Sequence, residues 1–237
     1  MKIGFLSDAH GNPGGVQICL ECFRKLNVDD IFFLGDAVGY FPDAKRTIDL
    51  LEIESVNCLI GNHDAMLLGH LSLDVESEEI YKIKETRERL DSHYLEKIAS
   101  WLPMKEIEIE GRRILCVHGS PWNPLNGYVY PNSNIQHFSY LPFDIVFIGH
   151  THRPFIRKSG SVVIVNVGSS SLPRDQGNQS SCAVYDSCGH TITVIRIPFN
   201  ENELIELYKD SIHFEVVDTL QRKDESGAVR NIIEELS

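Results

Sequence analysis

The chain has 237 residues, of which 42% are hydrophobic, and its formal net charge is −12. This length allows one large domain with a full core, and the acidic balance argues against non-specific nucleic-acid binding. A small anionic substrate is still compatible with it, because bound divalent cations can make an acidic protein locally positive.

The first residues run directly into a predicted strand, without a signal peptide. No apolar stretch approaches the roughly 20 residues that span a bilayer. We therefore expect a cytoplasmic protein with no membrane partner. Cys19 and Cys22 have a spacing used by zinc and redox sites, but they lie in a predicted helix and no second pair matches them, so helix packing is the favoured interpretation.

Strands and helices alternate over the first 60 residues. Strands are predicted at 2–7, 30–34 and 56–60, and helices at about 14–26 and 43–53. This order predicts parallel strands joined by right-handed crossovers. Much of residues 65–102 is helical in pattern, notably 77–101, with acid–base spacings such as Glu85–Arg89. We expect this stretch to form a helical cap.

The second half is richer in strands, which are predicted at 106–109, 113–117, 144–148, 162–165, 181–185 and 191–197. Together with the first half they predict an α/β fold in which two sheets are packed between helices. Residues 1–200 then form the main domain, and 201–237 form a helical appendage of it, with a helix at about 229–236. The segment 120–141 is long for a plain connection; a substrate-contacting loop and a covering loop both remain open.

Five polar motifs each follow an apolar run, so each is predicted to lie just past the carboxyl end of a buried strand. Ligands collect at that end of the strands in α/β sheets. The motifs are Asp8-x-His10, Gly35-Asp36, Gly61-Asn62-His63-Asp64, His118-Gly119 and Gly149-His150-Thr151-His152.

This ordered set resembles the signature of the calcineurin-like metallophosphoesterase family, which reads D-x-H, G-D, G-N-H-D/E, a lone His and G-H-x-H. Residues 35–40, 166–169 and 173–175 resemble, more loosely, a small prokaryotic branch of phosphodiesterase type. The resemblance implies a four-layer α/β/β/α sandwich of two mixed sheets flanked by helices, with the helical cap as an insertion.

The resemblance also implies a dinuclear metal centre. Two ions about 3.5–4 Å apart activate water and neutralise charge on a phosphate. The implied ligands are Asp8, His10 and His152 for one ion and Asn62, His118 and His150 for the other, with Asp36 bridging both. The mixed oxygen and nitrogen donors favour two divalent ions, Mn²⁺ first, with Fe²⁺, Zn²⁺ and Ni²⁺ as alternatives. On an extended backbone, Asp8 and His10 would point the same way, as would His150 and His152.

His63 is left without a metal, and the resemblance implies that it is the general acid, oriented by Asp64. By the same resemblance, Asn12 points its amide at a phosphate oxygen. Tyr40 either stacks an aromatic part of the substrate or packs under the cap. Related phosphatases carry an Arg soon after the Gly-Asp motif, which residues 35–42 lack, and Arg174 is a candidate replacement.

The leading hypothesis is therefore hydrolysis of a small phosphodiester or phosphomonoester, with the diester favoured because a monoester dianion would gain most from the missing Arg. A dinucleoside polyphosphate hydrolase and a serine/threonine protein phosphatase are alternatives. A non-catalytic scaffold that keeps the fold is an alternative of another class, but it has no chemical need for His63. The expected partner is a small phosphorylated substrate rather than nucleic acid, and a homo-oligomer remains open.

Overall fold

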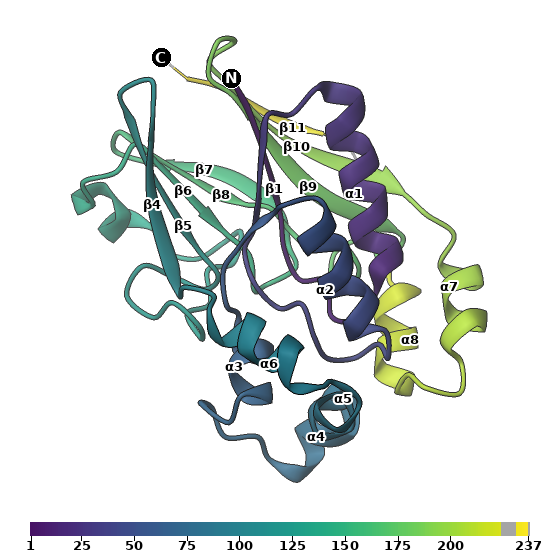
Figure 1. Ribbon diagram of the computed structural model, residues 1–237. Helices are drawn as coiled ribbons and strands as arrows, with labels where there is room; N and C mark the ends of the chain where they lie inside the picture. The colour runs from purple at the N-terminus through teal and green to yellow at the C-terminus, as the bar shows by residue number, and fades with distance from the viewer. Residues whose placement is uncertain (224–230, 237) are drawn as a thin grey trace.

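Two β-sheets packed face to face, with helices around them, form the computed structural model of the chain (Figure 1). It describes residues 1–223 and 231–236. The six-stranded sheet has the order β11-β10-β9-β1-β2-β3, and the five-stranded sheet the order β4-β5-β6-β8-β7. Within this described part of the chain, no helix has the length and apolar composition to cross a membrane.

The first sheet contains the predicted parallel strands. Its strands are β1 (Lys2–Leu6), β2 (Asp30–Phe33), β3 (Asn57–Cys58), β9 (Gln179–Asp186), β10 (Thr191–Pro198) and β11 (Ile232–Glu235). β1 pairs with β2, and β2 with β3, in parallel, whereas β9 pairs antiparallel with β1. Helices α1 (Pro13–Leu26) and α2 (Ala44–Ile53) connect the parallel strands and bury apolar side chains such as Leu20 and Ile48 against this sheet.

The second sheet comprises β4 (Met104–Ile109), β5 (Arg112–Val117), β6 (Ile145–Ile148), β7 (Phe155–Ser159) and β8 (Val162–Asn166). β7 was not predicted; it forms a hairpin with β8 through Gly160, whose φ is 60°. The outer face of this sheet is covered by residues 120–141, including the 3-10 helix η1 (Gln136–Tyr140) and its buried Phe138. The fourth layer of the sandwich is thus a loop and a 3-10 helix.

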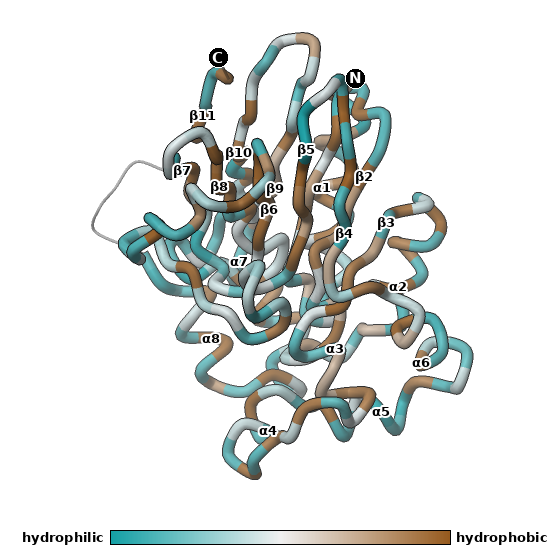
Figure 2. The backbone as a smooth tube through the Cα atoms, turned by 90° about the vertical axis from the view of Figure 1, so that its left-hand side faces the viewer, coloured by the Kyte–Doolittle hydropathy of each residue, from teal (hydrophilic) through white to brown (hydrophobic). Residues whose placement is uncertain are grey.

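The interior between the two sheets is apolar. The ring of Phe5 in β1 stacks on Phe147 in β6, with centroids 3.7 Å apart, and neither side chain is exposed. The apolar stretches of the chain coincide with the central strands of both sheets (Figure 2). The predicted two-sheet sandwich is therefore confirmed.

The cap consists of α3 (Asn62–Leu67), α4 (Val75–Tyr81), α5 (Ile83–Arg89) and α6 (Ser92–Ala99), which lie together below the sheets in Figure 1. The helical pattern predicted over 77–101 is confirmed, and it is divided among three short helices. Lys82 adopts a left-handed φ of 57°, which separates α4 from α5. Leu90 is extended, and Asp91 then caps α6, so the acid–base pattern belongs to three short helices.

The C-terminal segment contributes α7 (Glu201–Tyr208), α8 (Phe214–Leu220) and β11. The first two agree with a helical appendage. The prediction of a helix at 229–236 was wrong for Ile232–Glu235, because these residues form a strand that pairs antiparallel with β10. Residues 229–230 of this prediction lie outside the described residues. Two successive β-branched isoleucines suit a strand, and β10 offered a free edge for pairing.

Loss of the inter-sheet aromatic contact should destabilise the protein. Phe147→Ala should lower the free energy of unfolding by about 3–5 kcal/mol, because it removes a fully buried ring and leaves a cavity. Urea unfolding at a fixed metal concentration measures this. Ile53→Ala is the control, because Ile53 is 73% exposed and should change stability by less than about 0.5 kcal/mol. Equal losses in the two variants would contradict the assigned core.

Candidate metal centre

The five polar motifs meet where the strands of both sheets end. Asp8 and His10 follow β1, and Asp36 follows β2. Asn62 begins α3, His118 follows β5, and His150 and His152 follow β6. None of the expected ligands is more than 6% exposed: Asp8, His10, Asp36, Asn62, His118, His150 and His152. The predicted convergence is therefore present, and it concentrates buried polar groups at one point.

Asp8, His10 and His152 form the first candidate ligand set, with one ligand atom of each within 4.8 Å of the others. The Nε2 atoms of His10 and His152 are 2.9 Å apart, and Asp8 Oδ1 lies 3.3 Å from His152 Nε2. Asp8 Oδ1 is buried without a hydrogen-bond partner. Burial of such a carboxylate oxygen costs free energy unless a cation or a hydrogen-bond donor contacts it.

The two imidazoles of this set are tethered through their other nitrogens. His10 Nδ1 lies 3.2 Å from the carbonyl oxygen of Val38, and His152 Nδ1 lies 2.6 Å from that of Leu172. A carbonyl can only accept, so each Nδ1 carries a proton and the two Nε2 atoms face each other. Nε2 atoms 2.9 Å apart can both contact one cation, and such tethers through Nδ1 are typical of metal-binding histidines.

Asp36, His118 and His150 form the second set, and Asn62 joins it. His118 Nε2 lies 3.0 Å from Asn62 Oδ1 and 3.4 Å from Asp36 Oδ2. His118 Nδ1 donates to the carbonyl of Leu34 at 2.8 Å. His150 Nε2 is buried without a hydrogen-bond partner. This set therefore also presents a nitrogen and oxygens to an ion.

Asp36 contacts both sets through one oxygen. Its Oδ2 lies 3.4 Å from His118 Nε2 and 3.8 Å from His10 Nε2. Its Oδ1 accepts the backbone N–H of His63 at 2.8 Å, which fixes the plane of the carboxylate. This is the arrangement that a bridging ligand requires.

Charge at the site also fits metal binding. Burial alone would raise the pKa of Asp8 and Asp36, but His152 and His118 beside them hold both pKa values below the ordinary range. Burial lowers the pKa of His150 to about 3, which keeps that ring neutral. His118 differs: burial would lower its pKa, but Asp36 raises it to about 9, so a metal ion would replace a proton there.

The backbone at the site is left-handed rather than extended. The φ angles are 55° at Asp8, 51° at His10, 62° at Asp36, 64° at His150 and 56° at His152. The expected alternation of side chains on an extended chain is therefore wrong. Both strands end before these residues, and the left-handed turns bring two ligands of one loop towards the same point. Such conformations cost free energy and are typical of functional sites.

Asp64 does not bind the ring of His63. Its Oδ2 accepts the backbone N–H groups of Asp36 and Gly61 at 2.8 and 2.9 Å, and its Oδ1 accepts that of Ala37 at 2.9 Å. His63 Nδ1 is buried without a hydrogen-bond partner. Gly61 is needed here, since an added Cβ would lie 2.1 Å from Asp36 Oδ1. The structure thus places Asp64 behind the bridging carboxylate.

His63 lies beside the ligands, with its ring centroid 4.6 Å from that of His10. Its other ring neighbours are Tyr40 at 5.1 Å and Tyr81 of α4 at 4.4 Å. Burial lowers its pKa to about 4, although Asp36 acts in the opposite direction. The ring is therefore neutral, and it can donate one N–H to a group at the site. Tyr81 was missed, and its only sequence signal was its place in the cap.

Tyr40 and Arg174 lie at the edge of the centre. The Tyr40 ring meets that of His10 edge-on at 4.7 Å. Arg174 Nη2 donates to the Tyr40 hydroxyl at 2.9 Å, and the Arg174 backbone N–H donates to the carbonyl of His152 at 3.1 Å. Both residues are thus held next to the first ligand set.

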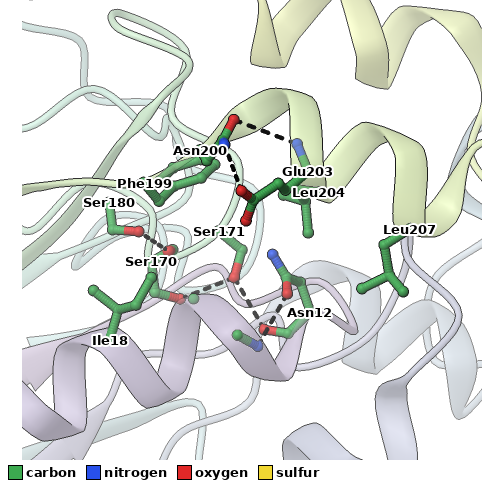
Figure 3. Close-up of a pocket in the computed structure, with 12 residues that line it drawn as sticks. Asn12, Ile18, Ser170, Ser171, Ser180, Phe199, Asn200, Glu203, Leu204 and Leu207 are labelled. Carbon is green, nitrogen blue, oxygen red and sulfur yellow. Dashed lines mark hydrogen bonds between the residues drawn. The ribbon is translucent and has the colours of Figure 1, made fainter.

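Asn12 is placed differently. Its Oδ1 accepts the backbone N–H of Gly14 at 3.0 Å and caps α1, and its carbonyl accepts the Ser171 hydroxyl at 3.2 Å. Asn12 lines a cavity of about 300 Å³ between α1 and α7, together with Phe199 and Leu204 (Figure 3). The lining includes none of the expected metal ligands. The structure therefore gives Asn12 a capping role.

Tyr128 is a second aromatic residue that the motifs did not reveal. Its ring centroid lies 4.1 Å from that of His150, and it stacks on Tyr130 at 5.7 Å. Its side chain is 55% exposed, so it offers a free ring face beside the second ligand set. The signal was the unusual length and aromatic content of 120–141. This contact favours a substrate-contacting loop.

Two ligand sets that share one carboxylate, at the strand ends of a two-sheet α/β sandwich, define a candidate metallohydrolase. Residues 1–189 match the family model of the calcineurin-like phosphoesterase superfamily domain. The chain belongs to this superfamily and is a hydrolase.

Relatives extend this comparison. The uncharacterized protein MJ0912 of Methanocaldococcus jannaschii is 28% identical over 223 residues, covering 86% of this chain and 90% of the relative. Phosphodiesterase YfcE of Escherichia coli is 24% identical over 193 residues, covering 79% and 88%. The fold is shared with a hypothetical protein, PH1004, from Pyrococcus horikoshii, with a TM-score of 0.81 at 18% identity, covering 93% of this chain and 98% of that one. A metallophosphoesterase from Sphaerobacter thermophilus has a TM-score of 0.77 at 24% identity with the same coverage.

The two ligand sets predict two metal ions per chain. Elemental analysis of protein loaded with Mn²⁺ should approach two, and Asp36→Asn should lose affinity for both because the bridging oxygen contacts both sets. Asp210→Asn, at an exposed carboxylate, is the control and should keep both ions. Binding of a single ion by folded protein in excess Mn²⁺ would contradict the dinuclear assignment.

Proposed function

We propose that the protein is a dinuclear metal-dependent phosphodiesterase that hydrolyses a small phosphodiester. The observation that carries this proposal is the pair of buried ligand sets that Asp36 contacts through one oxygen, with the ring of His63 beside them. When bound, two divalent ions would supply Lewis-acid activation of water and neutralisation of phosphate charge. The mixed nitrogen and oxygen donors favour Mn²⁺, with Fe²⁺, Zn²⁺ or Ni²⁺ as alternatives.

Residues around the ligands would protonate the leaving group and bind the phosphate. The protonated form of His63 transfers its N–H proton to the oxygen that leaves and becomes the neutral imidazole. Its ring is packed against Tyr40 and Tyr81, which also contact each other. The guanidinium of Arg174 binds a non-bridging phosphate oxygen, which is the role left open by the absence of an Arg after Asp36. The hydrogen bond from Arg174 to the Tyr40 hydroxyl orients this guanidinium at the edge of the centre.

Two aromatic surfaces support a diester rather than a monoester. Tyr40 lies against His10 of the first set, and Tyr128 lies against His150 of the second. A diester has two organic groups, one for each surface, whereas a monoester has only one. Two relatives, YfcE and the 24% identical MJ0936 of M. jannaschii, carry the name phosphodiesterase, which supports the same assignment.

The diester assignment predicts a substrate preference. With Mn²⁺ supplied, kcat/KM for bis-p-nitrophenyl phosphate should equal or exceed that for p-nitrophenyl phosphate, because the second aryl group gains contact with an aromatic surface. Steady-state assays of both esters at one pH measure this. A strong monoesterase with negligible diester cleavage would overturn the assignment and favour a phosphatase.

The role of His63 predicts a separation of turnover from metal binding. His63→Ala should keep both ions while kcat falls by about 10²–10⁴-fold, the usual contribution of a general acid. The loss should fall on kcat more than on KM. It should be larger for an alkyl or nucleoside leaving group than for nitrophenolate, which needs little protonation.

The matched variant for this test is His118→Ala, which removes a ligand of the second set and should lose one ion together with activity. Metal content and kcat are measured on both variants with good and poor leaving groups. His63 would not be the general acid if His63→Ala lowered metal content as much as His118→Ala, or left kcat unchanged on poor leaving groups.

A further inference from the structure

A cavity of about 320 Å³ opens between the cap and the C-terminal appendage. Its walls come from four parts of the chain. The loop after β2, helix α4, the loop after β8, and helix α8 with the following turn supply Tyr40, Ile80, Tyr81, Leu172, Arg174, Glu215, Val216, Thr219 and Arg222. We call this cavity the arginine pocket. Figures 1 and 2 both show α8 next to the cap helices α4 and α5.

The arginine pocket adjoins the metal centre on the side of His63. Tyr40 and Tyr81 line the pocket, and their rings also contact His63, at 5.1 and 4.4 Å between centroids. The two tyrosines contact each other edge-on at 5.1 Å. Since His63 is the proposed donor to the leaving oxygen, the group attached to that oxygen would extend into this pocket.

Two arginines, Arg174 and Arg222, line the pocket. Arg174 Nη2 donates to the Tyr40 hydroxyl at 2.9 Å, and Arg222 Nη1 donates to the backbone carbonyl of Arg174 at 3.3 Å. Among residues 1–223 and 231–236, neither guanidinium forms an ion pair with a carboxylate, including that of Glu215. Arg174 is largely buried, and Tyr40 and Asp8 favour its charged form, whereas Arg222 is exposed to solvent at the mouth of the cavity. An exposed guanidinium without an ion pair, beside a second arginine in one cavity, can bind an external anion.

The other lining residues define what carries this anion. Tyr40, Tyr81, Leu172 and Val216 provide aromatic and aliphatic surface, and Thr219 adds a hydroxyl. The surface exposed in the pocket is more polar than apolar, which suits a small charged ligand with one ring. A nucleoside or sugar bearing a phosphate matches this combination, because its ring packs on the tyrosines and its phosphate reaches Arg222.

Half of this pocket lies beyond the shared family domain. The match to the superfamily ends at residue 189, whereas Glu215, Val216, Thr219 and Arg222 belong to the C-terminal appendage. The appendage also packs on the metal-centre loop, since Val216 and Leu220 share an apolar cluster with Tyr40 and Phe41. The C-terminal appendage therefore adds to the metal centre a surface that can discriminate between substrates.

We propose that the arginine pocket binds the leaving group of the substrate, and that this leaving group is a phosphorylated nucleoside or sugar whose terminal phosphate is bound by Arg222, while Arg174 binds the phosphate that is cleaved. This inference rests on the phosphodiesterase activity proposed above. It names the substrate class as phosphodiesters with a second, terminal phosphate.

The test compares the dinucleotide TpT with its forms carrying an added 5′- or 3′-terminal phosphate. In the Mn²⁺-loaded wild-type protein, one phosphorylated form should have a kcat/KM at least about tenfold above that of TpT, since a charge-assisted hydrogen bond is worth at least that factor. Arg222→Ala should reduce this selectivity ratio to about one. Lys223→Ala is the matched control, because Lys223 pairs with Glu201 outside the pocket and should keep the ratio.

A binding measurement makes the outcome independent of turnover. By calorimetry, thymidine 3′,5′-bisphosphate should bind the wild-type protein at least about tenfold more tightly than thymidine 5′-monophosphate, and Arg222→Ala should abolish the difference. If bis-p-nitrophenyl phosphate is cleaved but neither selectivity appears, the arginine pocket is refuted and the phosphodiesterase stands. If no diester is cleaved but the bisphosphate selectivity depends on Arg222, the pocket stands and the proposed activity is refuted.

Discussion

The concentration of buried nitrogen and oxygen atoms at the strand ends is the constraint on which the site depends. Nε2 of His10 and Nε2 of His152 face each other at 2.9 Å, with their Nδ1 atoms committed to backbone carbonyls. Asp8 Oδ1 adds an unsatisfied oxygen to the same space. In a protein interior such a group of acceptors is stabilised only by positive charge. The loops around it therefore hold an arrangement that makes physical sense as a cation site.

The surrounding structure offsets the cost of this arrangement. The left-handed backbone at Asp8 and His150 directs these side chains to positions that an extended strand would not allow. The strands of both sheets stabilise these loops and so offset the conformational free energy. The Asp64 carboxylate accepts hydrogen bonds from the backbone N–H groups of Asp36, Ala37 and Gly61, and so fixes the backbone around Asp36. The carboxylate of Asp36, which contacts both candidate ligand sets, is thus positioned by covalent and hydrogen-bonded structure before any ion binds.

The sequence was sufficient to predict the two-sheet sandwich and the convergence of the five motifs, because each motif directly follows an apolar run and parallel strands bring their carboxyl ends together. It was not sufficient for features set by distant packing. The hydrogen bonds of Asp64 go to backbone atoms, which leave no trace in residue identity. The left-handed φ of Lys82 interrupts a helical pattern. Ile232 also lies in a helical pattern, but it pairs with the free edge of β10 and forms a strand. Tyr81 and Arg222 reach the site only through the placement of the cap and appendage, to which no motif points.

The position of β1 has a consequence for biosynthesis. β1, made first, lies in the middle of its sheet, with β2 on one side and β9 (Gln179–Asp186) on the other. During translation one edge of β1 stays unpaired until more than 170 residues have followed it, since β9 begins 173 residues after Leu6 ends β1. An open apolar edge is prone to pairing with other chains. The nascent protein must therefore shield this edge, with its own N-terminal βαβ unit or a chaperone, until β9 arrives.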